Sequence, residues 1–571
     1  MNQTAAPNER VTDHKTVDLR TIAHLCVEGL TSLGIQSLFC LPGVQNDPFF
    51  DALVDAPHIR PITTRHEQGA AYMAMGASQV TGRPAAFAVV PGPGLLNAGA
   101  ALTSAYWAGG RTLAVVGAIA DFQRGRNIGV LHELPDSSAV IAQLTKHQTY
   151  LDDGGQATRK LQRVLDTLLS GQPRPVAVEV PVDCWPQAVD GHLTPPVAVM
   201  PEADAESVER AARILARSER PLIVVGGGAH EASVEVRQLA ERLQAPVFTR
   251  RQGHGVIDSR HPLWCPLTVG RELWRDVDVV VGIGTRMEFP LNHWGIDEDL
   301  TIIQINVDET ELDRHNLGTI GLHGDAGPTV IALIEALGSS VGARPDRTVE
   351  VAERRAEFQR QAAFLEPQRA YLEVIRRVLP DSGVIVEDVT QLGFAAHLLF
   401  EFRHPRSFLT TGPAGTLGAG VAHAIGAQAA VPDRPVLGLV GDGGFLFTAA
   451  ELATAVQYEI PVTIVLHDNG GYGNVRTIQR ERFGADRTIA STLRNPDFVA
   501  LVKSFGAWAE EVDTPDGLQS SLARAIVHPG PSVVVLKTGD VPSPWPLMIM
   551  GRVRGRSPRR WRSMPGATAD D

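Results

Sequence analysis

Short apolar runs rich in Val and Ile recur along this chain, and each is followed by a turn and then by sequence that favours a helix. A parallel sheet covered by helices produces this alternation, because its strands are buried on both faces and each needs a crossover connection to the next. The runs lie at residues 85–90, 112–118 and 175–183, at 221–228, 277–285 and 301–308, and at 383–389, 435–444, 461–469 and 531–539.

The chain is therefore predicted to be an α/β protein with three doubly wound parallel-sheet domains. Its 571 residues agree with this number, since one domain usually takes roughly 100 to 200 residues. Stretches with turn-forming or charged composition and no apolar periodicity, at 185–206 and 338–348, are the expected linkers. The domains are expected at residues 12–185, 200–340 and 365–545, followed by an Arg-rich tail at 546–571.

The balance of charged and apolar residues excludes several classes of function. Lys and Arg number 52 against 64 Asp and Glu, a net charge of −12, so nucleic acid is not an expected partner. No apolar run reaches the roughly 20 residues of a membrane-spanning helix, and the polar first fifteen residues do not resemble a secretory signal. We therefore expect a cytoplasmic protein without membrane contact, whose four scattered cysteines are buried apolar side chains.

The end of the chain differs from the rest because six arginines lie between Arg552 and Arg562. They can contact an anionic group or a partner, or they can form a solvated, mobile tail. The sequence favours the solvated tail, since runs of like charge near a terminus are usually exposed.

Two Gly-rich loops in the last third, at 441–444 and 468–471, each follow an apolar run. The first is Gly-Asp-Gly-Gly, with helix-forming sequence from about Thr448, so backbone N–H groups there can bind phosphate. The second is Asp-Asn-Gly-Gly, and loops at the carboxyl ends of neighbouring parallel strands lie together. Carboxylate, amide and backbone oxygens are ligands that Mg²⁺ accepts alongside phosphate oxygens. The pair of loops predicts a metal–diphosphate site, and no ATP-type P-loop motif occurs.

These loops resemble the diphosphate motif of the thiamine diphosphate-dependent 2-oxo acid enzymes, in the acetolactate synthase-like branch, although the family more often has two Asn where this chain has Asp468 and Asn469. The resemblance covers residues 15–545 and implies pyrimidine-binding, central and diphosphate-binding domains. It implies Mg²⁺ ligands from Asp442, Asn469 and the carbonyl of Gly471, and places Leu417 where the family bends its cofactor. Further cofactor contacts are implied for Thr390, Gln391, Gly415, Thr416, Gly441, Gly443, Gly444 and Tyr472.

The first third carries the counterpart of this motif. Glu67 lies in an Arg-His-Glu-Gln-Gly-Ala run that resembles the family's cofactor-activating segment. Another interpretation is a helix capping box formed by Thr64 and Glu67. The resemblance implies that Glu67 hydrogen-bonds the pyrimidine of the cofactor and starts a proton relay. It also implies cofactor contacts from Pro91, Gly92 and Asn97.

Two positions near the expected reaction centre differ from the relatives. Val44 follows Leu-Pro-Gly, where decarboxylase-like relatives carry an acid or a serine, so ligation is favoured over simple decarboxylation unless Val44 only packs. With a two-residue gap, His132 takes the place of the glutamine in the Phe-Gln-Glu run of acetolactate synthases. His132 can contact or protonate the reacting group, or it can be a surface or structural histidine.

The expected acceptor site also differs from that of acetolactate synthases. Pro290 stands where they carry the arginine that receives the acceptor's carboxylate, and Ile478 stands where they carry a tryptophan. We therefore expect an acceptor other than a second pyruvate or 2-oxobutyrate. Arg476 and Arg480 can replace the missing charge, or they can be exposed helical arginines.

Together the resemblance implies a thiamine diphosphate- and Mg²⁺-dependent carboligase that decarboxylates a 2-oxo acid and transfers the acyl unit to a carbonyl acceptor. A decarboxylase or C–C lyase on the same cofactor, and a non-catalytic cofactor-binding homologue, are the alternatives. FAD stays open, because the turns at 226–228 and 282–286 and Asp308 match flavin-binding relatives while their Met-His-Gly-Thr segment is absent around 264–270. The resemblance also implies a homodimer or homotetramer with the active site between chains.

Overall fold

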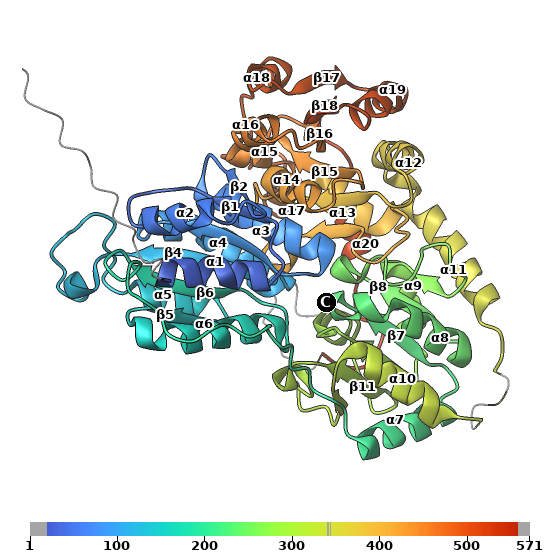
Figure 1. Cartoon of the computed structure of the whole chain (residues 1–571). Coiled ribbons are helices and arrows are strands. Elements are labelled where there is room, and N and C mark those ends of the chain that lie inside the picture. Colours follow the sequence, from blue (N-terminus) through green and yellow to red (C-terminus); the bar gives the residue numbers. More distant parts are fainter. Residues whose placement is uncertain (1–19, 340–341, 343, 558–571) are drawn as a thin grey trace, which may run out of the picture.

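The computed structural model describes residues 20–339, 342 and 344–557, which form three domains built on six-stranded parallel sheets (Figure 1). Helices cover the sheets, and the prediction of three doubly wound α/β domains is confirmed. The strand orders are β2-β1-β3-β4-β6-β5, β12-β11-β10-β7-β8-β9 and β14-β13-β15-β16-β18-β17.

The first domain, drawn from blue to cyan in Figure 1, provides one half of the candidate site. Its strands are β1 Ser37–Cys40, β2 Arg60–Thr63, β3 Ala85–Val89, β4 Thr112–Ala118, β5 His147–Tyr150 and β6 Val176–Pro181. Its helices are α1 Ile22–Ser32, α2 Asp47–Val54, α3 Glu67–Thr81, α4 Pro93–Ala108, α5 Ser137–Leu144 and α6 Gly154–Leu169.

The central domain follows and leads into the third. Its strands are β7 Leu222–Val225, β8 Val247–Thr249, β9 Trp264–Cys265, β10 Val279–Ile283, β11 Thr301–Asn306 and β12 Ile320–His323. Its helices are α7 Ala205–Arg217, α8 Ser233–Leu243, α9 Leu267–Trp274 and α10 Ala326–Leu337, with α11 Thr348–Gln361 packed on α9 on the way to the third domain.

The third domain, drawn from yellow to red in Figure 1, provides the other half of the candidate site. Its strands are β13 Val384–Glu387, β14 Phe408–Thr410, β15 Val436–Gly441, β16 Thr463–Asp468, β17 Trp508–Val512 and β18 Ser532–Lys537. Its helices are α12 Gln368–Val378, α13 Gln391–Leu399, α14 Gly420–Ala430, α15 Asp442–Thr448, α16 Glu451–Gln457, α17 Gly473–Phe483, α18 Phe498–Ser504, α19 Pro515–Ala525 and α20 Trp545–Met548.

All the apolar runs that the sequence predicts to be strands are strands, and they hold the central positions of the three sheets. The strands that the sequence missed lie at or next to sheet edges, among them β2, β9 and β17. Such strands are short, and β17 is not buried on both faces, so it lacks a continuous apolar run. Periodicity therefore located the sheet centres and left the edges unassigned.

Helices α3 and α14 join the first and third domains at close range. A Cβ on Gly76 would lie 2.1 Å from the carbonyl oxygen of His423, and one on Gly426 would lie 2.0 Å from that of Met73. Only glycine permits such an approach of two backbones. The Gln79 side chain then hydrogen-bonds His423 Nε2 at 2.8 Å across the same contact. The two domains that carry the candidate site are therefore held rigidly within one chain.

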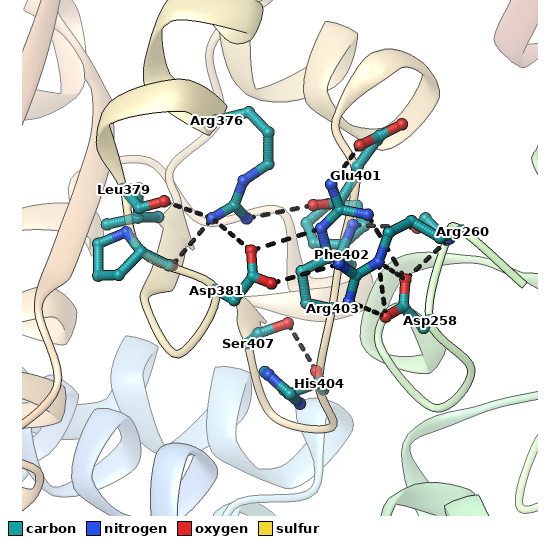
Figure 2. A network of polar contacts seen from close by, with 12 residues as sticks. Asp258, Arg260, Arg376, Leu379, Asp381, Glu401, Phe402, Arg403, His404 and Ser407 are labelled. Carbon is teal, nitrogen blue, oxygen red and sulfur yellow. Dashed lines mark hydrogen bonds and ion pairs between the residues drawn. The ribbon is translucent and has the colours of Figure 1, made fainter.

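An ion-pair network fixes the central domain against the third (Figure 2). The Arg403 guanidinium lies between Asp258 of the central domain, at 3.5 Å, and Asp381 of the third, at 3.7 Å. Arg260 bridges the same two carboxylates at 2.6 and 3.4 Å. In the same region the Phe402 N–H donates to Ser259 Oγ at 3.0 Å. A backbone hydrogen bond thus joins the central and third domains beside the ion pairs.

The Arg-rich segment is not a solvated tail where the structure describes it. Residues up to Ser557 lie on the central domain, and Arg556 forms an antiparallel bridge with Ile296. The side chain of Arg554 is buried, pairs with Asp297 at 2.6 Å and donates to the carbonyls of Trp274 and Val277. Of the arginines that gave the prediction, those from Arg559 onward lie outside the described residues.

Replacing Arg554 with alanine is expected to lower the free energy of unfolding by about 2 kcal/mol, because two buried carbonyls and Asp297 lose their partner. Arg552, which is exposed on the same segment, is the matched control, and Arg552→Ala is expected to change stability by less than about 0.5 kcal/mol. Urea denaturation of both variants measures the difference. Equal effects would mean that the segment contributes no specific docking.

The fold also bears on the cysteines and on the apolar character of the helices. All four cysteines are buried and unpaired, as predicted. Across the described ranges, no helix combines the length and the apolar character needed to cross a membrane.

Candidate active site

The loops after β1, β2, β3 and β4 carry the candidate residues of the first domain. These strands are neighbours in one parallel sheet, so their carboxyl ends lie at the same edge. The loops bring Val44 and Gln45, Glu67, Gly92 and His132 to that edge. Val44 and His132 are almost ninety residues apart in the sequence, and they therefore lie at the same edge of the sheet.

Glu67 begins α3 and is 9% exposed. Its Oε2 accepts a hydrogen bond from Asn97 Nδ2 at 3.0 Å, which ties it to α4. The capping-box interpretation is wrong, because His66 is the N-cap residue and its Nδ1 accepts from Gln68 N. Thr64 Oγ1 instead donates to the carbonyls of Cys40 and His66. Helix capping therefore does not explain why a carboxylate stands at this position.

His132 lies beside the loop that carries Pro91 and Gly92. Gly92 has a φ of +60°, and a Cβ there would lie 2.6 Å from the His132 carbonyl oxygen. Gly92 is the N-cap of α4, whose Asn97 holds Glu67, so His132 and Glu67 border the same helix end. The sequence placed His132 here only through a gapped comparison. It did not identify Gln45, whose Oε1 lies 3.2 Å from His132 Nδ1.

The loops after β14, β13, β15 and β16, again neighbours in one sheet, carry the candidate residues of the third domain. Thr390 and Gln391 follow β13, and both are buried. Thr390 packs on Gly441, since a Cβ on that glycine would lie 3.4 Å from the Thr390 Cβ. Leu417 lies on the loop between Gly415 and Gly418, two glycines with positive φ, and is partly exposed.

The glycines of the first Gly-rich loop make room for protein atoms as well as for a ligand. A Cβ on Gly443 would lie 2.7 Å from the Tyr472 ring, and one on Gly444 would lie 2.7 Å from Asp388 Oδ2. Helix α15 begins at Asp442 itself, not near Thr448 as the sequence predicted. The first backbone N–H groups of α15 therefore belong to the loop.

Asp442 is the centre of a polar cluster between the two Gly-rich loops. Its Oδ2 accepts from Gly471 N at 2.8 Å and from Asn495 Nδ2 at 2.6 Å. The same Asn495 amide donates to Asp468 Oδ1 at 2.8 Å. Burial, together with the nearby Asp468 carboxylate, holds the pKa of Asp442 above its usual range. Asn495, on the segment that pairs with Gly471 through Thr492, lay outside the motifs and was missed.

The three predicted metal donors lie on adjacent loops, and contacts within the chain already engage two of them. Asp442 contacts the N–H of Gly471, while the carbonyl of Gly471 accepts from Gly473 N at 2.9 Å. The Asn469 side chain lies against Gly473, since a Cβ there would meet Asn469 Nδ2 at 2.1 Å.

Unpartnered acceptor atoms surround this cluster. Asp388 Oδ2, Gln391 Oε1 and Asn495 Oδ1 are buried and have no hydrogen-bond partner among the residues that the structure describes. Buried acceptors without partners are costly, so they indicate a ligand or an ion that is not part of the chain. Carboxylate and amide oxygens are a donor set that suits Mg²⁺. These residues therefore fit a magnesium–diphosphate group.

Asp388 is the fully buried member of the cluster, and burial raises its pKa to about 6. Below that pH the folded carboxyl is neutral, whereas the unfolded one is already charged above about pH 4. The unfolded state thus binds fewer protons between about pH 4 and 6, so this group's contribution to stability falls by up to about 3 kcal/mol as the pH rises through that window.

Asp388→Asn removes this titration, so its stability relative to the parent protein is expected to rise by up to about 3 kcal/mol between pH 4 and 7. Urea denaturation of the cofactor-free protein across that range gives the measurement. A stability difference that does not change with pH would show that Asp388 is ionised in the fold throughout.

Arg476 is not an exposed helical arginine. Its guanidinium is buried and donates to the carbonyl oxygens of Asn469 at 3.0 Å and Gly470 at 3.3 Å. It also pairs with Asp540, which Arg480 contacts at 2.7 Å. Arg476 therefore holds the second Gly-rich loop in place, and the interpretation that it is an exposed helical arginine is wrong.

A cavity of about 490 Å³ lies where the central domain meets the other two. The predicted turns at 226–228 and 284–286 line it, together with Trp107 of the first domain and Arg406 of the third. The turns pack on each other, since a Cβ on Gly228 would lie 2.8 Å from Gly284 Cα. Arg250 and Arg251 also line the cavity, and burial lowers the pKa of Arg250 to about 9. Asp308 does not line the cavity and instead pairs with Arg174 at 3.4 Å.

The two half-sites of one chain contact opposite parts of α4. Asn97, near the start of α4, binds Glu67, whereas Ser104 hydrogen-bonds Thr416 at 2.9 Å and Ala108 packs on Gly412. At 1.5 Å per residue, Asn97 and Ala108 are about 16 Å apart along the helix. Among the described residues no hydrogen bond joins Glu67 to the loops after β13 to β16. Within one chain the two half-sites thus contact α4 at different points along its length.

Comparison with known proteins agrees with the division into three domains. Profiles described as the N-terminal TPP binding domain, the central domain and the C-terminal TPP binding domain of thiamine pyrophosphate enzymes match this chain. They match residues 20–140, 208–333 and 388–536, respectively.

Characterised relatives align over almost the whole chain. A probable 2-ketoarginine decarboxylase of Pseudomonas aeruginosa is 32% identical over 529 residues, covering 90% of this chain and 94% of the relative. A probable acetolactate synthase large subunit of Methanocaldococcus jannaschii is 29% identical, with 89% and 90% covered. Among solved structures, a thiamine diphosphate-dependent 4-hydroxybenzoylformate decarboxylase of Rhodococcus jostii has the same fold. It has a TM-score of 0.78 and 22% identity, and the match covers 91% of this chain and 99% of that one.

Proposed function

This chain belongs to the thiamine pyrophosphate enzyme family, acetolactate synthase-like, and we propose that it is a carboligase that uses thiamine diphosphate and Mg²⁺. Its donor is a 2-oxo acid, which it decarboxylates, and its acceptor is a carbonyl compound. When bound, thiamine diphosphate supplies a nucleophilic carbon and takes up the electrons that decarboxylation releases. The chain supplies binding, orientation and proton transfer.

Residues of the two half-sites divide this work. Asp442, Asn469 and the Gly471 carbonyl would hold the metal, and the surrounding loops would hold the diphosphate. Glu67, fixed by Asn97, would exchange a proton with the cofactor's pyrimidine. The partly exposed Leu417 would contact the bound cofactor. Burial of Glu67 and of Asp442 favours a water-poor site in which a reactive acyl group persists long enough to be transferred.

The side chain at position 44 is the single observation that favours ligation over simple decarboxylation. Release of an aldehyde requires a proton donor beside the reacting carbon. Val44, which is 59% exposed at the edge that also carries Glu67, cannot donate one. His132 lies on the same edge, and its Nδ1 already faces Gln45.

A 2-oxo acid decarboxylase is the second candidate. The named activity of the Pseudomonas aeruginosa relative favours it, since that protein is described as a probable 2-ketoarginine decarboxylase. In this case a protonated His132 would supply the proton that Val44 cannot.

Incubating the purified protein with a panel of 2-oxo acids, each with and without aldehyde or ketone acceptors, separates the two candidates. The panel includes pyruvate and 2-keto acids with cationic and aromatic side chains. We expect products that join the acyl unit to the acceptor, identified by mass spectrometry and dependent on thiamine diphosphate. Free aldehyde without a ligation product would establish the decarboxylase instead. No turnover with any 2-oxo acid would leave the non-catalytic homologue.

We propose that the complete site forms between two chains of a homodimer or homotetramer. The contact of the two half-sites with different points along α4 supports this. So do apolar side chains exposed next to both half-sites, which are Leu96 and Leu131 in the first domain and Leu446 and Phe447 on α15.

Mixing two inactive variants tests this arrangement. In a mixed dimer of Glu67→Ala and Asp442→Ala chains, one site would carry both changes and the other none. Co-expression in equal amounts should give half mixed dimers, and thus about a quarter of the parent activity. No regained activity, with mixed dimers demonstrated by differential tags, would place each site within a single chain.

The cavity beside the turns at 226–228 and 284–286 suits an anionic ligand, because the buried side chains of Arg250 and Arg251 line it. FAD is the ligand that the family resemblance offers for this position. The visible absorption spectrum of the purified protein tests it, since bound flavin is yellow. A colourless protein that stays colourless after incubation with FAD would exclude a flavin here.

A further inference from the structure

The side chain of Gln45 contacts both the backbone and the His132 side chain of the segment that carries His132. It follows β1 and is only 5% exposed. Its Oε1 lies 3.2 Å from His132 Nδ1, and its Nε2 donates to the Leu131 carbonyl oxygen at 3.4 Å. One amide group thus contacts both the ring of His132 and the peptide bond before it.

The amide of Gln45 can adopt only one orientation here. Its backbone carbonyl accepts from Trp185 Nε1 at 2.7 Å, and its Cβ packs on Gly117 of β4, so the start of the side chain is fixed. Turning the amide over would bring Oε1 against the Leu131 carbonyl oxygen, and two acceptors repel each other. Oε1 therefore faces the histidine ring.

An acceptor facing Nδ1 determines which ring nitrogen carries the proton. Because Gln45 Oε1 cannot donate, His132 Nδ1 must be the N–H nitrogen, and Nε2 of the neutral ring is then unprotonated. Nε2 forms no hydrogen bond with any residue in the described part of the chain. It is therefore available to a bound substrate.

The backbone of the segment holds the ring in this position. His132 has a φ of +67°, which non-glycine residues rarely adopt, and it is packed against Gly92. The Glu133 carboxylate closes the turn by accepting from the N–H groups of Gly129 at 2.6 Å and Val130 at 3.0 Å. The fold thus holds His132 in a strained backbone conformation. A histidine that only faces solvent would not require that strain.

We propose that Gln45 is a positioning residue that fixes His132 in the Nδ1–H tautomer, so that the unprotonated Nε2 is the proton acceptor at the substrate position. This rests on the proposed function, because it assigns the substrate to the edge of the sheet where Glu67 lies. A neutral ring with a free Nε2 accepts a proton and does not supply one. That property suits the last step of ligation, in which the hydroxyl on the donor-derived carbon would pass its proton to Nε2. The C–O bond would become a carbonyl as the bond from this carbon to the cofactor breaks, with the bonding electrons returning to the cofactor.

Three variants and one matched control separate positioning from packing. Gln45→Leu removes both amide contacts, whereas Gln45→Glu keeps an acceptor for Nδ1 and loses the donor to Leu131. Gln148→Leu replaces another glutamine of the same domain, whose Oε1 has no partner. His132→Gln identifies the resonances of His132 in ¹⁵N spectra of holoenzyme labelled on histidine.

In the holoenzyme we expect the ¹⁵N shifts of His132 to report a protonated Nδ1 and an unprotonated Nε2, and Gln45→Glu to keep that pattern. Gln45→Leu should release the ring to the Nε2–H form. Its kcat for ligation should fall roughly tenfold to hundredfold, with the donor KM changed less than about twofold. Gln45→Glu should stay within about threefold of the parent kcat, and Gln148→Leu should match the parent protein.

The ¹⁵N spectra do not depend on turnover, so this proposal can fail independently of the proposed function. A protonated Nε2 in the parent protein would overturn the assignment of the tautomer. Equal losses of kcat in Gln45→Leu and Gln45→Glu would overturn the positioning role, because they would show that only the contact to Leu131 matters. An absence of 2-oxo acid turnover together with the Nδ1–H pattern would overturn the proposed function and leave the tautomer assignment standing.

Discussion

Glu67→Gln is expected to lower kcat by about two to four orders of magnitude while thiamine diphosphate still binds. The substitution keeps the shape of the side chain and an oxygen for the Asn97 amide, so the start of α3 should be unchanged. What it removes is the ability to exchange a proton with the cofactor. Steady-state kinetics give the loss, and titration of thiamine diphosphate followed by protein fluorescence shows whether binding survives.

A matched change on the surface distinguishes this effect from a general loss of charge. Glu209 on α7 is exposed and pairs only with Arg213 at 3.5 Å, so Glu209→Gln should leave kcat and cofactor binding unchanged. If Glu67→Gln retained the parent kcat, then the buried carboxylate at the start of α3 would not be the activating group. The family resemblance would then have misplaced the central residue of the mechanism.

Asp442→Asn is expected to weaken Mg²⁺-dependent binding of thiamine diphosphate by at least about a hundredfold. Asparagine can still accept from Gly471 N, so the loop after β15 should keep its shape. It supplies no negative charge, however, and the raised pKa of Asp442 shows that burial makes this charge costly to hold without a cation. Isothermal titration with thiamine diphosphate at a fixed Mg²⁺ concentration measures the change.

Asp468→Asn is the control for this prediction. Asp468 shares the Asn495 amide with Asp442, but it is not one of the proposed metal ligands. We expect its affinity for the cofactor to remain within about tenfold of the parent value. Equal losses in the two variants would contradict Asp442 as the metal ligand and would indicate that the carboxylate pair as a whole provides the charge.

The sequence was most informative where one chemical role uses neighbouring residues. The first Gly-rich loop and Asp442 could be predicted because a strand, a glycine turn and a helix follow one another directly. Glu67 could be predicted through a similar short run, although its geometry also allowed a capping box. The partners of these residues could not be predicted, since Asn495 and Asp388 reach Asp442 and Gly444 from separate loops.

Some wrong interpretations share a physical cause. Arg476 was grouped with Arg480 as an exposed helical residue, and the arginines after Arg552 were interpreted as solvated. Local sequence indicates that a side chain is charged but not which carbonyls it reaches. In the fold, Arg476 meets the Asn469 carbonyl and Arg554 meets that of Trp274. Whether such an arginine is buried depends on the backbone carbonyls that surround it in the fold.

By itself, the sequence determined three parallel-sheet domains, because strand burial is written in consecutive residues, and it predicted Glu67 and the two Gly-rich loops as site residues. Only the tertiary structure decided how these parts contact one another. It attached the two half-sites to different points of α4, and it set Gln45 against His132 across eighty-seven positions of sequence. The physical reason is that parallel strands bring their carboxyl ends together regardless of the length of chain between them. Proton positions and charge partners at such an edge therefore depend on the fold.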